Sequence, residues 1–223
     1  IGVRLGFGFA ITLALLITIA VVSYMRMNAL SENVDSMVTD RFPKTIQANN
    51  MIDAINNIAR QLRNAYIYSG AEQQKSLEAL PPERKVITEN LEKLEKTIRS
   101  EKGKEILKSI QVTRAAYVVT QEKFIELLKA DKKADIVTLM QGDLRRTQTE
   151  YIKAVNTLID FQTKAMEKSG KDAEETVNGA IRLIMILGAI ATLLTVIFAW
   201  VITRSITRPI NEALNAATRL AEG

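Results

Sequence analysis

The sequence predicts an all-α protein in which two membrane-spanning helices flank an antiparallel, up-down-up-down four-helix bundle. Two long apolar stretches lie near the ends of the 223-residue chain. Between them, residue types that favour helices dominate, and the helix breakers are confined to three places. Apolar residues of this middle segment recur three and four positions apart, without a period-two alternation that would indicate strands.

The first element is a membrane-spanning helix over residues 5–25, and its counterpart near the other end covers residues 183–203. Each is a run without charged residues that is bounded by arginines on both sides. The lengths match the roughly 20 residues that cross a hydrocarbon core about 30 Å thick. A signal peptide is the alternative for the first run and a buried core helix for the second, but the first run exceeds the length of a typical signal-peptide core.

Basic residues outside the two spans predict the orientation. Arg4 precedes the first span, and Arg204, Arg208 and Arg219 follow the second. By the positive-inside rule both termini are therefore expected in the cytoplasm, and residues 26–182 outside it. The net charge of +5 is divided between these anchors and the exported segment, so we expect no nucleic-acid partner.

The exported segment is expected to contain four helices separated by three groups of breakers. The breakers are Ser69-Gly70 with Pro81-Pro82, then Gly103, then Asp131-Lys132-Lys133. The helices would run from the membrane to about Tyr68, from Pro82 to about Lys102, from Lys104 to about Ala130, and from Lys133 back to the membrane. Ser69 followed by Glu72 predicts a capping box at the start of a short helical turn.

Each of the four helices has an apolar seam that predicts its core face. The first three seams are Ile52, Ile55, Ala59, Leu62, Tyr66; then Ile87, Leu91, Leu94, Ile98; then Ile106, Ile110, Thr113, Tyr117, Thr120, Phe124, Leu127. The fourth is Thr147, Tyr151, Ala154, Leu158, Phe161, Ala165. Short corners between the helices predict the up-down-up-down connection.

Composition excludes much chemistry, because the chain has no Cys and no His. Zinc fingers, thiol nucleophiles, Ser-His-Asp triads and disulfides are therefore impossible. Acidic pairs such as Glu92 with Glu95 are interpreted as solvated helix faces, so we expect no catalytic residue, no metal site, no cofactor and no enzymatic activity. Because the chain begins at Ile1 rather than Met and stops at Gly223 within an unfinished pattern, we expect it to be part of a longer protein.

A further helix is expected after the second span. The pattern Arg-x-Ile-x-x-Pro-Ile covers Arg204 to Ile210, and Pro209 is expected to begin a new helix. Its apolar seam, suited to a parallel coiled coil, is Ile210, Leu214, Ala217 and Leu220. This stretch, residues 204–223, resembles the first helix of a HAMP linker, the adaptor that follows the last span of bacterial transmembrane receptors. An amphipathic helix lying on the inner leaflet is the alternative.

The order of span, four-helix exported domain, span and HAMP linker resembles that of bacterial methyl-accepting chemotaxis proteins. The motif covers only the last twenty or so residues, and the rest of the resemblance is architectural. It implies a homodimeric receptor of the inner membrane whose periplasmic domain, residues 26–182, binds a ligand. The output would be control of a histidine kinase through a coupling protein. The input half of a sensor histidine kinase or cyclase, and a membrane-anchored structural or partner-binding helical protein, remain alternatives.

Polar residues on the predicted seams indicate a ligand site. The candidate ligand-binding residues are Arg60, Arg63, Arg114, Tyr117, Arg145, Thr147 and Tyr151. At 1.5 Å per residue, all of them are expected in one layer roughly 10 to 27 Å below the distal end of the bundle. In aspartate-type chemoreceptors, arginines of the first helix and a Thr of the fourth hold the ligand, and Arg60, Arg63 and Thr147 resemble these by location only.

Arginines next to hydroxyl groups suit a carboxylate, because the guanidinium is a planar fork that binds both carboxylate oxygens. The seam breaks contain no acidic residue that would attract a cation. We therefore expect a small di- or tricarboxylate such as malate, succinate or citrate. The ordinary alternative is that these arginines pair with neighbouring acids or face solvent.

Overall fold

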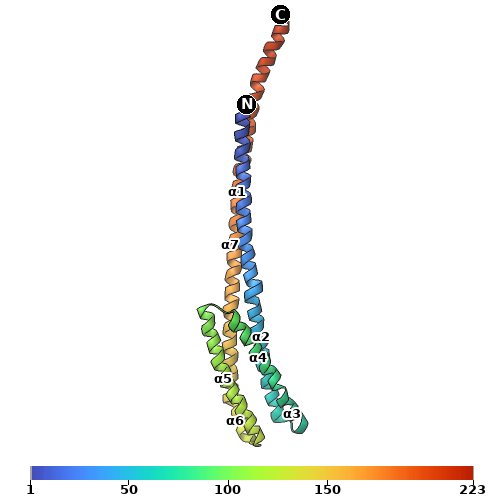
Figure 1. Ribbon diagram of the computed structural model, residues 1–223, viewed down its shortest axis with the longest axis vertical. Coiled ribbons are helices and arrows are strands. Elements are labelled where there is room, and N and C mark those ends of the chain that lie inside the picture. Colours follow the sequence, from blue (N-terminus) through green and yellow to red (C-terminus); the bar gives the residue numbers. More distant parts are fainter. Residues whose placement is uncertain (1, 223) are drawn as a thin grey trace. The chain divides into compact units, whose positions relative to one another are not determined.

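A computed structural model describes residues 2–222, and every regular element in this range is a helix (Figure 1). Packing divides the chain into two units, which are described separately. Residues 35–169 form one, and the two terminal segments, up to residue 34 and from residue 170, form the other. The elements are α1 Gly2–Asp35, the π-helix η1 Ser36–Arg41, α2 Phe42–Ile67, α3 Gly70–Glu78, α4 Leu80–Thr97, α5 Glu101–Lys129, α6 Lys133–Gln141 and α7 Asp143–Glu222.

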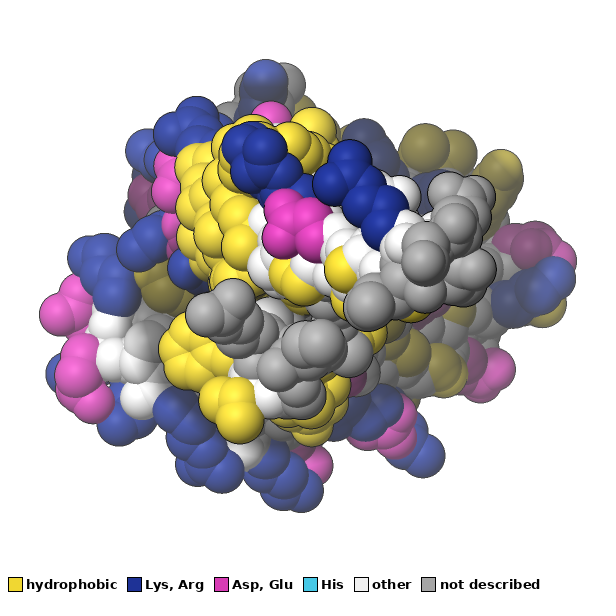
Figure 2. All heavy atoms as spheres, turned by 90° about the horizontal axis from the view of Figure 1, so that it is seen from above, with side chains coloured by type: hydrophobic (Ala, Val, Ile, Leu, Met, Phe, Trp, Pro, Cys, Tyr) yellow, Lys and Arg dark blue, Asp and Glu magenta, His cyan; other side chains and the backbone are white. Residues whose placement is uncertain are grey.

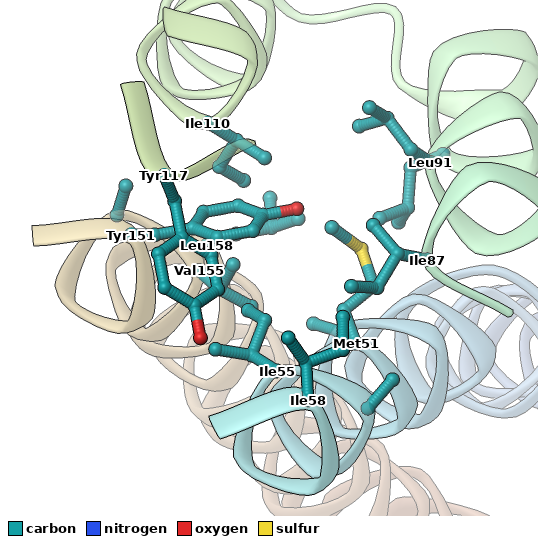
Figure 3. Close-up of a cluster of buried hydrophobic side chains, with 14 of the residues drawn as sticks. Met51, Ile55, Ile58, Ile87, Leu91, Ile110, Tyr117, Tyr151, Val155 and Leu158 are labelled. Atoms are coloured by element: carbon teal, nitrogen blue, oxygen red, sulfur yellow. The ribbon is translucent and has the colours of Figure 1, made fainter. Parts of the chain in front are cut away.

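The unit of residues 35–169 is an all-α four-helix bundle, which confirms the predicted fold class. Helices α2, α4, α5 and the first part of α7 alternate in direction and enclose one apolar core (Figures 1 and 3). The inner positions of the predicted seams are buried, among them Ile55, Leu94, Ile110 and Leu158. Each such side chain contributes about 1.5 to 3 kcal/mol through removal of its apolar surface from water.

A π-helical turn over Ser36–Arg41 precedes α2, and the sequence analysis did not predict it. The backbone N–H of Phe42 donates to the carbonyl of Met37, five residues earlier, instead of four. Pro43 explains the wider turn, because it has no N–H group and its ring would collide with the carbonyl four residues earlier in an α-helix. Pro43 was therefore the overlooked signal.

The corner between α2 and α4 contains a short helix, α3, as predicted, but the capping box does not form. Ser69 is the N-cap residue, and its side chain makes no capping hydrogen bond. Instead Nε2 of Gln73 donates to the carbonyls of Ala65 and Tyr68 at 2.8 and 3.3 Å. The side chain of Gln73 therefore satisfies the carboxyl end of α2 and fixes α3 against it.

The prediction that Gly103 separates the second and third helices was wrong. Helix α4 ends at Thr97, and the corner is Ile98–Ser100. Gly103 lies in the first turn of α5, where its N–H donates to Oγ of Ser100 at 3.2 Å. A Cβ atom there would lie 2.5 Å from Cγ2 of Ile98, so glycine is needed for the close approach of the corner and not to end a helix.

The fourth predicted helix is divided into α6 and α7 by Gly142, which the sequence analysis had treated as helical. Gly142 has φ −100° and ψ −105°, a conformation outside the helical region. The preceding corner was predicted correctly, since Asp131 adopts φ 51° between α5 and α6. Helix α6 is thus a short additional element at the corner between α5 and α7.

The second unit contains two helical stretches that are apolar and long enough to cross a membrane, within α1 and α7. Few residues of these stretches are buried, as is expected of surfaces that face lipid rather than water. Figure 2, which looks onto the end of the molecule where α7 ends, shows uncovered hydrophobic side chains beside basic ones. The guanidinium of Arg204 lies 5.3 Å from the ring centre of Trp200, a cation–π contact.

The prediction that Pro209 begins a new helix was wrong, because α7 continues through it to Glu222. Of the predicted coiled-coil seam, Leu214 and Ala217 are exposed in the single chain. The side chains of Ile210 and Leu220 lie outside the described residues, as does Gly223.

Candidate functional site

Two tyrosines occupy the polar break in the core that the sequence had indicated. Tyr117 on α5 and Tyr151 on α7 are each 1% exposed. Their ring centres are 6.3 Å apart and the ring planes meet at 52°. Figure 3 shows both among the aliphatic side chains of the core, which include Ile110, Val155 and Leu158. The tyrosines therefore pack as core residues, as their seam positions predicted.

The hydroxyl groups of these tyrosines are buried, and neither has a hydrogen-bond partner among the described residues. Burial raises the pKa of Tyr117 far above its usual value, although the nearby guanidinium groups of Arg63 and Arg84 act in the opposite direction. Burial likewise raises the pKa of Tyr151, opposed by Arg114. Three guanidinium groups thus act to lower the pKa values of the two phenols, but burial outweighs them. Neither phenol has a hydrogen-bond acceptor of its own among the described residues.

Beside the tyrosines, two threonines connect α5 to α7. The Oγ1 atoms of Thr120 and Thr147 are 2.9 Å apart, and both residues are buried. Each hydroxyl also lies 2.9 Å from a carbonyl of its own helix, that of Tyr117 or Asp143. Because the two hydroxyls have only two hydrogens for these three contacts, one Thr donates to the other while its partner donates to a carbonyl.

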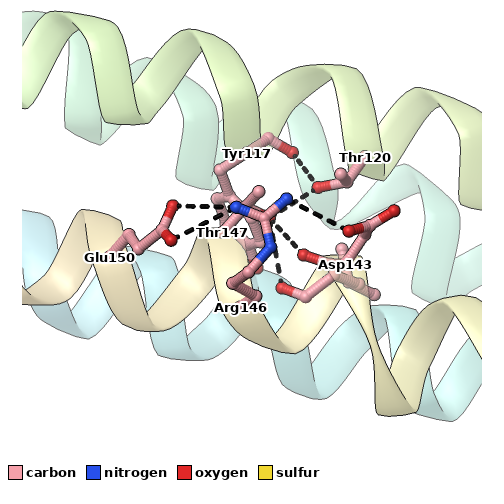
Figure 4. A network of polar contacts seen from close by, with 7 residues as sticks. Tyr117, Thr120, Asp143, Arg146, Thr147 and Glu150 are labelled. Atoms are coloured by element: carbon pink, nitrogen blue, oxygen red, sulfur yellow. Dashed lines mark hydrogen bonds and ion pairs between the residues drawn. The ribbon is translucent and has the colours of Figure 1, made fainter.

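Arg146 precedes Thr147 on α7 and is exposed, and Figure 4 shows it with its partners Asp143 and Glu150. Its guanidinium donates to Asp143 at 3.1 Å and to Glu150 at 3.2 Å. These hydrogen bonds raise the pKa of Arg146 above its already high ordinary value. Arg146 is therefore engaged by two acids of its own helix, as the ordinary alternative for flanking arginines anticipates.

Two arginines form hydrogen bonds between α4 and α5, and one of them was missed by the sequence analysis. Arg84 donates from Nε and Nη2 to Oε1 of the buried Gln121, at 3.0 and 2.9 Å. Arg114, a predicted site residue, donates to Oγ1 of Thr88 at 2.7 Å. Arg84 and Gln121 lie 37 positions apart, so no local pattern could have paired them.

An open cavity of about 420 Å³ lies between α2, α6 and α7 and brings two predicted arginines together. Arg63 comes from α2 and Arg145 from the first turns of α7. The remaining lining residues are Ala59, Met140, Leu144, Gln148, Thr149 and Ile152. Two cations, an amide, a hydroxyl and apolar walls without any acidic side chain suit a small anion that also has an apolar or hydroxylated part.

The seven predicted residues thus fall into separate groups within the bundle. Tyr117, Thr147 and Tyr151 share the buried layer, Arg63 and Arg145 share the cavity, and Arg114 is bonded to Thr88. Arg60 is exposed and donates to Asn57 of its own helix at 2.8 Å. Among the described side chains, no group of three acids gathers as a metal site would require.

The fold defines a class of protein, an all-α four-helix-bundle domain joined at both ends to helices apolar enough to cross a membrane. Over residues 1–177 the chain matches the family described as a four helix bundle sensory module for signal transduction. It belongs to this family, whose bundle is that of a chemoreceptor sensor domain. Searches of curated proteins and of solved structures gave no significant match.

Proposed function

We propose that this protein is a two-pass chemoreceptor of the bacterial inner membrane that senses a small di- or tricarboxylate, such as malate or citrate, in the periplasm. It acts as a receptor and not as an enzyme. The family match supports a sensory role in signal transduction. The lining of the site supports the ligand class, and the two apolar stretches with their flanking arginines support the membrane topology.

The cavity between Arg63 and Arg145 is the observation that carries the ligand assignment. Among the side chains that the structure describes, neither guanidinium forms a hydrogen bond or an ion pair with an acid. Two guanidinium groups on different helices can each bind one carboxylate of a dicarboxylate. Gln148 and Thr149 add groups that recognise a hydroxyl or a further carboxylate.

Signal transmission would use α7, because Arg145 and residues 183–203 belong to the same helix, Asp143–Glu222. A ligand held between α2 and α7 favours the arrangement in which both arginines reach it. The ligand can shift the equilibrium between the two signalling states only by the difference in its affinity for them. The displacement would reach a HAMP linker that begins in residues 204–223, in a homodimer that controls a histidine kinase through a coupling protein.

Titration of the purified chain with succinate, malate and citrate in detergent tests this proposal. A ligand that binds only the folded bundle raises the melting temperature with concentration. Arg63→Gln and Arg145→Gln should each weaken binding at least about tenfold, because each removes a charged hydrogen bond. Arg60→Gln is the matched control one turn away on α2 and should change the affinity less than about twofold.

Two results would refute the assignment. A melting temperature unchanged by all three acids would refute the assignment of a carboxylate ligand and favour a partner-binding role. Equal losses in the Arg60→Gln and Arg63→Gln variants would show that general charge, and not the cavity, governs binding.

A further inference from the structure

A second cavity lies at the opposite end of the same bundle, where the π-helical turn η1, the corner between α4 and α5, and α7 meet. Its volume is about 270 Å³. It is lined by Asp40, Arg41, Lys44, Thr97, Ile98, Arg99, Ser100, Phe161 and Gln162. None of these residues belongs to the cavity around Arg63 and Arg145, so its chemistry can be considered separately.

The lining carries an excess of positive charge. It contains three basic residues, Arg41, Lys44 and Arg99, against the single acid Asp40. Asp40 accepts from Nζ of Lys44 at 2.6 Å. Arg41 and Arg99 form no ion pair with any acidic side chain that the structure describes. Two positive charges of this cavity are therefore left without an acidic counterpart.

Burial makes this excess significant. The side chain of Lys44 is only 8% exposed. Nε of Arg41 is buried and has no hydrogen-bond partner in the described chain. A buried donor without an acceptor is unfavourable, so an anion that reaches Arg41 is favoured by more than its charge alone.

The corner between α4 and α5 adds further donors. Ser100 is the N-cap of the 29-residue helix α5, and its Oγ accepts from the N–H of Gly103. The hydroxyl hydrogen of Ser100 remains available to donate, and the amino end of a long helix carries a partial positive charge. The cavity thus receives donors from two separate stretches of chain, the η1–α2 junction and the α4–α5 corner. These donors are arginine, lysine and hydroxyl groups and the amino end of α5.

We propose that this cavity binds a doubly charged tetrahedral oxyanion, of which inorganic phosphate and sulfate are the simplest examples. Two negative charges match the two unpaired cations, and four acceptor oxygens match donors that approach from the η1–α2 junction and the α4–α5 corner. A planar carboxylate offers acceptors in one plane only and suits this arrangement less well.

Asp40 and the oxyanion compete for Lys44. Asp40 lies within the π-helical turn and Lys44 in α2, so their ion pair spans the junction between the two helix types. A bound oxyanion replaces Asp40 as the partner of Lys44 and frees the carboxylate of the turn. Removing the competing charge by Asp40→Asn should therefore tighten oxyanion binding, whereas removing a cation should weaken it.

Isothermal titration of the purified 223-residue chain with sodium phosphate, sodium sulfate and sodium succinate tests the proposal. Dodecyl maltoside is a suitable detergent because it contains no phosphate, and the ionic strength is held constant with sodium chloride. We expect saturable binding of phosphate and sulfate at concentrations below about 10 mM. Arg41→Gln should weaken it at least about tenfold and Arg99→Gln about three- to tenfold, since each removes a charged donor.

Three variants test whether oxyanion binding depends on this cavity. Lys108→Gln removes an exposed charge from α5 outside both cavities and should leave the affinity unchanged. Arg63→Gln should also leave phosphate binding intact, so failure of the carboxylate proposal and failure of this one are distinguishable. Arg99 is exposed at the corner, so its variant remains informative if Arg41→Gln disturbs the π-helical turn.

Several results would overturn the proposal. They are the absence of saturable phosphate and sulfate binding, equal affinities in wild type and both arginine variants, a loss in Lys108→Gln as large as in Arg99→Gln, or succinate bound more tightly than phosphate at this site. Weaker binding in Asp40→Asn would contradict the competition for Lys44.

Discussion

Replacing Gly103 by Ala is expected to destabilise the bundle, although the same change stabilises most helices. Gly103 lies in the first turn of α5 against the corner that Ile98 and Ser100 form. An added Cβ would lie 2.5 Å from Cγ2 of Ile98 and 2.8 Å from Oγ of Ser100. Both distances are shorter than real side-chain contacts allow, so the corner must move.

The size of the effect follows from three contributions. Ala is favoured over Gly in a helix interior by about 1 kcal/mol, and by less in the first turn. Overpacking of a filled site costs about 1 to 3 kcal/mol. Displacement of Ser100 from its capping contact costs about another 1 kcal/mol. The free energy of unfolding should therefore fall by about 1 to 3 kcal/mol, which lowers the melting temperature of a unit of this size by about 3 to 10 °C.

Urea unfolding followed by a brief pulse of protease measures this change, because it reports on the bundle and is insensitive to the apolar helices in detergent. Gly170→Ala is the control for the same substitution without a clash, since Gly170 lies within helix α7 just outside the bundle of residues 35–169, and apart from its own helix backbone no atom lies within 4 Å of its added Cβ. The control should leave the free energy of unfolding of the bundle unchanged or raise it by no more than about 0.5 to 1 kcal/mol. A Gly103→Ala variant as stable as this control would show that the corner does not pack closely against α5.

Three further outcomes follow from the buried polar layer. Tyr117→Phe should raise the free energy of unfolding, measured in urea, by about 1 kcal/mol, because it removes a buried hydroxyl without a partner. A decrease of similar size would mean that the hydroxyl is hydrogen-bonded in solution. Gln121→Leu should lower the free energy of unfolding by about 1.5 to 3 kcal/mol, because it leaves Arg84 without its acceptor. The double variant Arg84→Leu with Gln121→Leu should lower it less. Equal decreases in the two variants would show that the unpaired guanidinium of Arg84 is not the cause. Burial raises the pKa values of Tyr117 and Tyr151 in the folded chain. The stability that this gives the fold is fully present below about pH 10, the ordinary pKa of tyrosine. Above that pH the unfolded chain releases protons that the folded chain keeps, so stability is lost. Stability should then fall by about 1.4 kcal/mol per pH unit for each tyrosine, and a double Phe variant with the same slope between pH 10 and 11 would refute this assignment.

The corners of the bundle show how far local chemistry predicts a fold. Asp131 lies at a corner that its neighbours indicated, and the apolar spacing of α5 identified Ile110 and Phe124 as core residues. Gly103 was interpreted as a helix breaker, although it is a small residue needed for a close contact. Glycine has both roles, and only the neighbouring Ile98 distinguishes them.

Proline shows the same ambiguity in the opposite direction. Pro209 was expected to begin a helix and lies inside α7, whereas Pro43 drew no attention and follows a π-helical turn. A proline removes one N–H group in either case. Whether the chain responds by ending, continuing or widening the helix depends on how the turns on both sides are held.

The candidate site could be predicted in part. Spacing placed Tyr117, Thr147 and Tyr151 on inward faces, and the structure shows them together in one buried layer. Arg63 and Arg145 were expected in one layer, and they line one cavity. Arg84 with Gln121 was missed, because a hydrogen bond between α4 and α5 joins residues that no helical repeat relates.

By itself the sequence determined the class of fold, the two apolar stretches and the inward faces of the helices, because helical periodicity and apolar length are local properties of the chain. The tertiary structure alone decided which polar groups meet. It assigned an amide to Arg84, the hydroxyl of Thr88 to Arg114 and a shared cavity to Arg63 and Arg145. Spacing along a helix fixes the direction of a side chain, whereas its partner depends on the rotation and depth of the neighbouring helix, which only packing of the whole core sets.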